Sequence, residues 1–239
     1  MRKSIFKLAA VSVAMSAMAV SAPVFAQDAA AEEASGPITI TGGIAVVSDY
    51  RFRGVSLSDK DFAVQPYLTV KHESGFYVGV WGSNLAENAG DDVEVDLYAG
   101  FAGGDAVTYD IGATYYVYPG VSSFNYVELT GKLGTTVGPA TIGGQVSYVP
   151  SQDNTGNSDN IYVATNAAIA IPETPLTIVG SVGFEDGAFG NEKIDWTVGL
   201  TANVEGFTLG ATYVDTDRNS TFAFKDSKAG VVFSVSYGF

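Results

Sequence analysis

One stretch of the sequence decides the fold, and it reads Ala229-Gly230-Val231-Val232-Phe233-Ser234-Val235-Ser236-Tyr237-Gly238-Phe239. Side chains alternate between two faces along an extended strand, so one face of this stretch is apolar throughout. The other face carries two glycines, two serines and Val232. Such a strand suits an outer-membrane barrel, in which the apolar face meets lipid and the last strand closes against the first. The alternative is the last strand of a soluble β-sandwich.

The aromatic end of this stretch also resembles the C-terminal signal by which bacterial outer-membrane proteins are recognised for assembly. The residues that would form this signal are Phe233, Val235, Tyr237 and Phe239. We therefore expect the outer-membrane assembly machinery of a Gram-negative bacterium to be a partner of the chain.

The beginning of the chain has the pattern of a secretory signal peptide. A basic start with Arg2, Lys3 and Lys7 precedes the apolar run 8–20, and Val24-Phe25-Ala26 fits a cleavage site. We expect residues 1–26 to be a cleaved signal peptide, residues 27–37 a disordered acidic leader, and residues 38–239 an outer-membrane barrel.

The composition excludes several classes of function. Cleavage after residue 26 would leave 9 Lys and Arg against 26 Asp and Glu, a net charge of −17, which argues against nucleic-acid binding. The chain has no cysteine, so disulfides and cysteine-based metal or catalytic sites are excluded. Beyond the signal peptide no apolar run approaches the roughly 20 residues of a spanning helix, so any membrane crossing must use strands.

The rest of the chain divides into two-faced segments. In the clearest one, Val93, Val95 and Leu97 alternate with Glu94 and Asp96, and two acids on one face require that face to be wet. Twelve such segments follow one another, at 38–46, 62–71, 76–80, 93–101, 107–117, 127–137, 140–148, 161–171, 176–185, 194–204, 207–213 and 229–239.

The connections between these segments alternate in length. Short turns are expected at 72–75, 103–105, 137–139, 172–175 and 204–206, and longer polar links at 54–60, 84–92, 119–125, 150–160, 185–192 and 215–228. Short turns at one end and long loops at the other are typical of outer-membrane barrels. The sequence therefore predicts an all-β, transmembrane, antiparallel up-and-down β-barrel of about 12 strands, with both termini periplasmic.

Aromatic residues gather near the ends of the predicted strands, on the face expected to meet lipid. They would form the girdles that lie at the headgroup level, although aromatic residues also favour strands in general. The set is Tyr50, Phe52, Phe62, Phe76, Phe101, Tyr109, Tyr115, Phe184, Trp196 and Tyr213.

Charged residues fall on the opposite face and are candidates for the lining of a pore. The candidates are Asp49, Arg51, Arg53, Asp59, Asp61, Glu94, Asp96, Asp110, Glu128, Lys132 and Asp195. They would line a narrow aqueous pore and set its preference among ions or polar solutes, or they would pair with one another and close the interior.

Three stretches resemble a known family. Ser48-Asp49-Tyr50-Arg51-Phe52-Arg53-Gly54-Val55-Ser56, Gly75-Phe76-Tyr77-Val78-Gly79-Val80-Trp81-Gly82-Ser83-Asn84 and Glu94-Val95-Asp96-Leu97-Tyr98-Ala99-Gly100 are similar to the TorF family of porin-like proteins, formerly named for a Gly-Cys-Trp motif. The resemblance implies an outer-membrane barrel and brings no catalytic residue. Val80 stands where the motif name has cysteine, so no thiol chemistry is implied.

Three classes of function follow, and the first is favoured. The first is a channel for passive diffusion of ions or small polar solutes, weakly cation-preferring because the interior carries more acid than base. The second is a non-conducting structural or binding barrel with an ion-paired interior and extracellular loops that contact partners. The loop at 152–160 has oxygen ligands that could hold calcium, but it lacks a defined calcium-binding motif, so a plain solvated loop is the favoured interpretation. The third is an enzyme, which we do not expect, because the one histidine, His72, lies at a predicted turn and no Gly-x-Ser-x-Gly motif occurs.

We therefore expect no catalytic, cofactor or metal site. The expected surroundings are outer-membrane lipid and lipopolysaccharide, and the oligomeric state is left open.

Overall fold

A computed structural model describes residues 37–86, 92–217 and 228–239. The predicted signal peptide 1–26 and residues 27–36 of the predicted leader lie outside the described residues.

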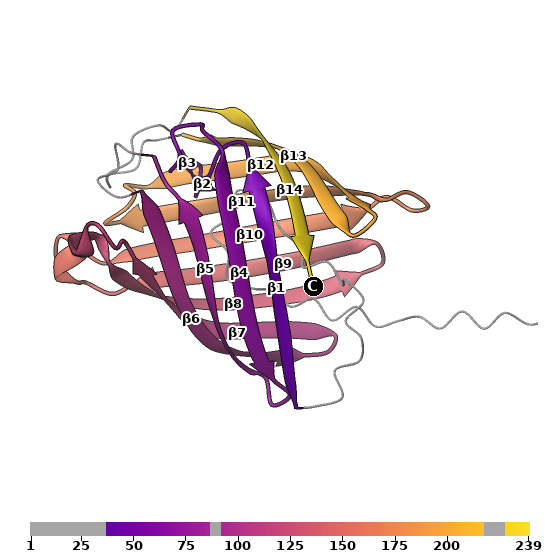
Figure 1. Ribbon diagram of the computed structural model, residues 1–239, viewed down its shortest axis with the longest axis horizontal. Helices are drawn as coiled ribbons and strands as arrows, with labels where there is room; N and C mark the ends of the chain where they lie inside the picture. Colours follow the sequence, from indigo (N-terminus) through magenta and orange to yellow (C-terminus); the bar gives the residue numbers. More distant parts are fainter. Residues whose placement is uncertain (1–36, 87–91, 218–227) are drawn as a thin grey trace, which may run out of the picture.

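Twelve of the described strands form a closed antiparallel barrel, as the sequence predicts (Figure 1). Each strand pairs with its neighbour along the chain, and β1 pairs with both β4 and β14 to close the ring. The barrel strands are β1 (Ile38–Val47), β4 (Ala63–His72), β5 (Phe76–Asn84), β6 (Val93–Gly104), β7 (Val107–Val117), β8 (Tyr126–Val137), β9 (Ala140–Val149), β10 (Asn160–Ala170), β11 (Leu176–Gly187), β12 (Lys193–Val204), β13 (Phe207–Thr216) and β14 (Gly230–Gly238).

Short elements complete the described chain. Strands β2 (Arg51–Phe52) and β3 (Val55–Ser56) form a separate two-stranded sheet, and two single-turn 3-10 helices cover Ser122–Phe124 and Asp153–Thr155. No helix in the described residues is long and apolar enough to cross a membrane.

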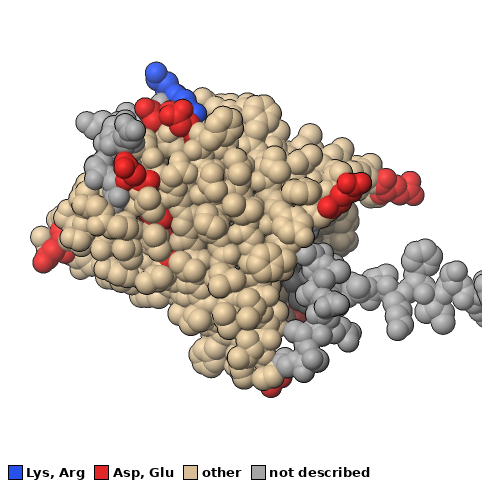
Figure 2. All heavy atoms as spheres, in the orientation of Figure 1, with Lys and Arg blue, Asp and Glu red and all other residues tan. Residues whose placement is uncertain are grey.

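The two faces of the wall follow the predicted alternation. On β6, Val93 and Leu97 are exposed on the outer face while Glu94 and Asp96 are buried inside. Figure 2 shows a broad uncharged surface on the visible face of the wall, with acidic side chains mostly toward its margins.

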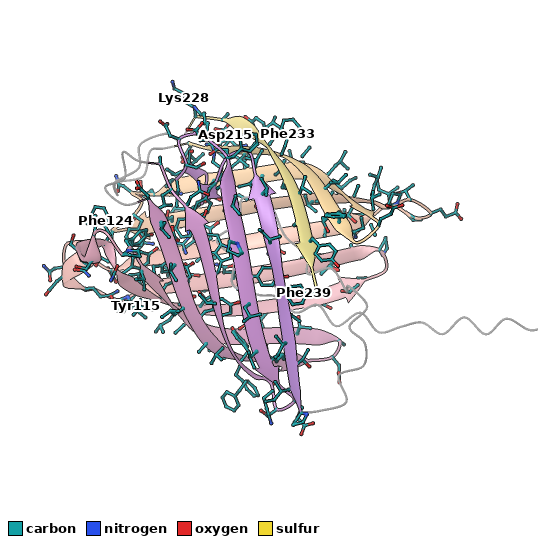
Figure 3. All side chains as sticks on the ribbon, in the orientation of Figure 1. Tyr115, Phe124, Asp215, Lys228, Phe233 and Phe239 are labelled. Atoms are coloured by element: carbon teal, nitrogen blue, oxygen red, sulfur yellow. The ribbon has the colours of Figure 1, made fainter. Side chains whose placement is uncertain are left out.

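The terminal stretch keeps the same alternation. Its exposed residues on β14 and just beyond are Val231, Phe233, Val235, Tyr237 and Phe239. Figure 3 places Phe233 and Phe239 toward opposite ends of this strand.

The connections alternate in length as predicted. Residues 73–75, 105–106, 138–139, 171–175 and 205–206 form turns at the end of the barrel that also holds the start of β1 and the end of β14, which we call the short-turn end. Residues 48–62, 118–125, 150–159 and 188–192 connect strands at the opposite, long-loop end, where β5, β6, β13 and β14 also have the ends that face the two undescribed segments of the chain.

The first connection departs from the prediction. We expected Tyr50 and Phe52 on the lipid face, but β1 ends at Val47, Tyr50 is 1% exposed, and Phe52 packs against the interior cluster of buried aromatic residues. Ser48 ends the pairing with β14, because its hydroxyl accepts a hydrogen bond from the Phe233 amide at 2.9 Å. Serine and aspartate side chains compete with the strand ladder for backbone partners and favour turns, so the strand does not continue here.

Tyrosines inside the barrel lie over glycines of neighbouring strands. The Tyr77 ring covers Gly100, so its hydroxyl reaches Asp110 at 2.7 Å, and the Tyr98 ring covers Gly79, so its hydroxyl reaches Thr69 at 2.6 Å. A glycine leaves room for the ring to lie flat against the wall. The many glycines of the sequence thus allow large polar aromatic side chains to fit inside a small barrel.

We predict that Gly100→Ala destabilises the barrel by about 1–3 kcal/mol, the usual cost of overpacking. A methyl group at this position would lie 2.7 Å from the Ile111 carbonyl oxygen and would displace the Tyr77 ring. Urea unfolding of the refolded barrel, followed by tryptophan fluorescence, measures the effect. Gly131→Ala is the matched control, since a Cβ there meets nothing within 4 Å; equal stability of the two variants would contradict the prediction.

Candidate functional site

The connection between β1 and β4 folds into a small hairpin at the long-loop end. Phe52 pairs with Val55 across a turn whose central residues, Arg53 and Gly54, have φ angles of 48° and 87°. Two positive φ angles are what a type I′ turn requires, and asparagine and glycine are the residues that favour them. Arginine in the left-handed region costs about 1–2 kcal/mol, so other contacts must hold Arg53 in this position.

The base of the hairpin is organised by Asp49. Its carboxylate accepts hydrogen bonds from Arg51 Nε at 2.6 Å and from the Ser56 hydroxyl at 2.6 Å, so it joins the two arms. Arg51 is completely buried and donates from Nη1 to the carbonyl oxygens of Gly54 and Lys228, at 3.1 and 2.8 Å. These contacts fold the connection on itself.

The tip of the hairpin carries Arg53 to the barrel wall. Its guanidinium donates to Glu128 of β8 at 2.5 Å and to Glu185 of β11 at 2.6 Å. The same group lies 4.2 Å from the ring centroid of Tyr162 and 4.6 Å from that of Phe52. The planar fork of arginine can bind two carboxylates at once, which a lysine ammonium cannot do with the same geometry.

Lys193 joins this group from β12. Its Nζ lies 3.0 Å from Glu185 and 3.6 Å from Asp195, and it donates to the carbonyl oxygen of Arg53 at 2.6 Å. We call Arg53, Glu128, Glu185, Lys193 and Asp195 the Arg53 cluster. The cluster contains two cations and three carboxylates, so it holds one excess negative charge when all are ionised.

A second group lies on β6 and carries no basic partner among the described ion pairs. Glu94 accepts a hydrogen bond from the Tyr50 hydroxyl at 3.2 Å and also hydrogen-bonds to Tyr118 and Asp96. One oxygen of Glu94 and one of Asp96 are buried without a hydrogen-bond partner. The two acids therefore lie side by side in the interior with hydroxyl partners and without a cation.

A third group lies nearer the middle of the wall. Asp110 of β7 is directly opposite Lys132 of β8, and both are buried in the interior. The Tyr77 hydroxyl donates to Asp110 at 2.7 Å. This pair is balanced in charge.

The structure brings most of the predicted site residues together inside the barrel. Asp49 and Arg51 form one pair; Arg53, Glu128 and Asp195 belong to the Arg53 cluster; Glu94 lies with Asp96 and Asp110 with Lys132. The hairpin, rather than an extended first strand, presents Asp49, Arg51 and Arg53 to the interior.

Two predicted positions are wrong. We expected Asp59 and Asp61 to continue the interior face on the returning strand, but β4 begins at Ala63 and both residues are exposed on the connection. The backbone of Asp59 is left-handed, with φ of 53°, so the chain turns here instead of extending.

Sequence reasoning missed two central members of the site. Glu185 lies on the polar face of its predicted strand, so the alternation of side chains was a signal for it. Lys193 lies two residues before Asp195 and therefore on the same face of the strand. Both sit at the boundary of a predicted loop, where alternation is hardest to extend. The tyrosines that hydrogen-bond to the carboxylates were also missed as site residues: Tyr50, Tyr77, Tyr116, Tyr118 and Tyr162.

His72 and the 150–159 loop, considered above for catalysis and for calcium binding, make local structural contacts. His72 is the exposed last residue of β4, and its Nδ1 accepts a hydrogen bond from the Ser74 amide at 3.1 Å. The side-chain amides of Gln152 and Asn154 hold the 150–159 loop against residues 122–127 by hydrogen bonds to backbone groups of that segment. Within residues 37–86, 92–217 and 228–239, no group of three or more His, Asp or Glu side chains is placed to hold a metal ion.

We predict that Arg53→Met lowers the free energy of unfolding by about 3–5 kcal/mol, because it leaves Glu128 buried without its cation and Glu185 with Lys193 alone. Urea unfolding with tryptophan fluorescence as the readout checks this. Asp61→Asn is the control, since it removes a charge from an exposed position on the same connection and should change stability by at most about 0.5 kcal/mol. A small, equal effect of both substitutions would show that the cluster does not hold the hairpin.

Solved structures share this architecture. The KdgM porin superposes with a TM-score of 0.57 at 8% sequence identity, over 83% of this chain and 98% of that one. The NanC porin gives a TM-score of 0.55 at 12% identity, over 84% and 99% of the two chains. An outer membrane channel from Pseudomonas putida F1 gives 0.50 at 8% identity, over 85% and 96%. At these identities the likeness establishes the fold.

Comparison of the sequence itself gives the family. No curated protein matches the chain. A family model described as "Bacterial protein of unknown function (Gcw_chp)" matches residues 31–238. The chain therefore belongs to the Gcw_chp family.

Proposed function

We propose that the chain is a porin-like outer-membrane channel for passive diffusion of ions or small polar solutes, with a weak preference for cations. The observation that carries this proposal is a closed barrel with an apolar outer belt and an interior lined by charged and hydroxyl side chains. A closed ring pairs the backbone polar groups between strands, so the wall can face hydrocarbon. A polar interior is the feature that distinguishes channels from filled apolar cores.

The orientation follows from the ends of the barrel. The short-turn end would be periplasmic, together with both termini, and the long-loop end would face outward beside lipopolysaccharide. Aromatic pairs support an interfacial girdle at the short-turn end, where the ring of Phe101 lies 4.9 Å from Phe76 and 5.9 Å from Tyr109. The predicted signal peptide 1–26, the assembly signal ending at Phe239 and the resemblance to TorF family porins agree with export to the outer membrane.

The preference for cations rests on the balance of interior charges. The pairs Asp49–Arg51 and Asp110–Lys132 are neutral, while the Arg53 cluster and the Glu94–Asp96 pair each hold an excess negative charge. Charges in a narrow interior of low dielectric act on a passing ion without touching it. The excess of negative charge in the half of the barrel nearer the long loops favours cations.

A non-conducting structural or binding barrel is the second candidate, and one observation favours it. The hairpin lies inside the long-loop end, and its charges are bound to charges of the wall. In this case the interior charges serve stability, and the long loops contact partners. In both cases we propose a protein without enzymatic activity and without a cofactor.

Single-channel conductance in a planar bilayer tests the first candidate. We expect discrete conductance steps and a reversal potential displaced toward the equilibrium potential of the cation. The double substitution E94Q/D96N should lower the cation-to-anion permeability ratio by about two-fold, because it removes the negative charge of two carboxyl groups that have no basic partner. The matched control is Asp105→Asn, an exposed acid in a turn at the short-turn end.

A refolded barrel that gives no steps would favour the second candidate. A ratio that does not change in E94Q/D96N would place the source of selectivity elsewhere in the interior, and a preference for anions would refute the cation assignment.

A further inference from the structure

The hairpin β2–β3 is a structural unit of its own inside the barrel. Its two strands pair with each other and with no strand of the described barrel. Asp49 ties the two arms together at their base, and Ser58 closes the loop by accepting from the Tyr50 amide at 2.8 Å. The hairpin can therefore keep its shape when its contacts with the wall change.

The hairpin reaches the wall on many sides. The Tyr50 ring lies 5.4 Å from Trp81 of β5, and the Phe52 ring lies 6.2 Å from Tyr116 of β7. A Cβ on Gly54 would lie 2.7 Å from Thr216 of β13. With the contacts of Arg53 to β8, β10 and β11, these span most of the ring, so the hairpin lies across the interior.

Charge-assisted contacts hold the tip of the hairpin. Arg53 binds Glu128 and Glu185, and its own carbonyl oxygen accepts from Lys193 at 2.6 Å. Buried carboxylates need a cation, so Arg53 and the two glutamates hold one another in place and fix the tip against the wall.

We propose that the β2–β3 hairpin is a gate across the long-loop end of the barrel, and that Arg53 is the latch that keeps it shut by binding Glu128 and Glu185. Release of Arg53 frees the tip, and the hairpin swings out as a unit about its base at residues 48 and 58–61. This inference rests on the proposed channel function and specifies how that channel is regulated.

Conductance of a latch-free variant is the first test. The triple substitution R53M/E128Q/E185Q removes the three charges together, so no charge of the latch is left unpaired in the interior. We expect a several-fold rise in conductance or in the time spent open. E173Q/E205Q is the control, because it changes two exposed acids in turns at the short-turn end and should leave conductance unchanged. Heat-dependent gel mobility establishes that each variant is folded.

A hairpin-free variant separates the two proposals. Replacing residues 51–56 by a Gly-Ser linker removes the obstruction itself. If this variant conducts more than the parent while the triple variant does not, the hairpin is a fixed plug and the latch is refuted. If it conducts no more than a conducting parent, the hairpin does not obstruct the path and the gate is refuted. If all folded variants are silent, the channel function itself fails.

Thiol reactivity gives a readout that does not depend on conductance. The chain has no cysteine, and Val55 in the hairpin is 3% exposed, so Val55→Cys introduces a single buried reporter. A water-soluble thiol reagent should react with it about ten-fold faster when the latch substitutions are present, because the open population rises. Should the triple variant fail to fold, Arg53→Lys takes its place, since lysine keeps the charge but not the fork that binds both carboxylates. Equal reactivity with and without the latch would overturn the proposal.

Discussion

Closure of the sheet between β1 and β14 is the constraint on which the rest of the structure depends. A sheet whose outer face is apolar can meet lipid only if no strand edge is left unpaired, because hydrocarbon offers no hydrogen-bond partners. The register that closes the ring places Gly43 opposite both Gly238 and Tyr67. Once the ring is closed, every second side chain must point inward, and the character of the interior is set by those positions.

The interior is narrow, and its polar groups have to satisfy one another. Glycines allow tyrosine rings to lie flat on the wall, and the tyrosine hydroxyls then reach buried carboxylates such as Asp110 and Asp195. The hairpin occupies space at the long-loop end, and its Arg53 binds two further carboxylates, Glu128 and Glu185. Burial of the carboxylates that bind Arg53 is tolerated because they have a cationic partner. Removing that partner would leave a buried charge unpaired and destabilise the fold.

The faces of the strands were predictable because alternation is a local property with a period of two residues. The outer and inner sides of β6, β7 and β14 follow from residues such as Glu94, Asp110 and Phe233 without any knowledge of their neighbours. The prediction failed at residues 49–61, where it assumed that the first strand continues. Hydrogen bonds that the Ser48 and Asp49 side chains accept end the strand there, and their donors, Phe233 and Ser56, are not identified by alternation.

The sequence by itself determined the barrel, its number of strands, its apolar belt and the segregation of short turns from long loops, because each of these is a repeating pattern along the chain. Only the tertiary structure decided which interior charges meet. Glu128 and Glu185 lie 75 and 132 residues after Arg53 along the chain. The three residues come together because the ring brings β8 and β11 around a hairpin that turns inward. Pairing of this kind depends on three-dimensional distance, which no periodicity in the sequence encodes.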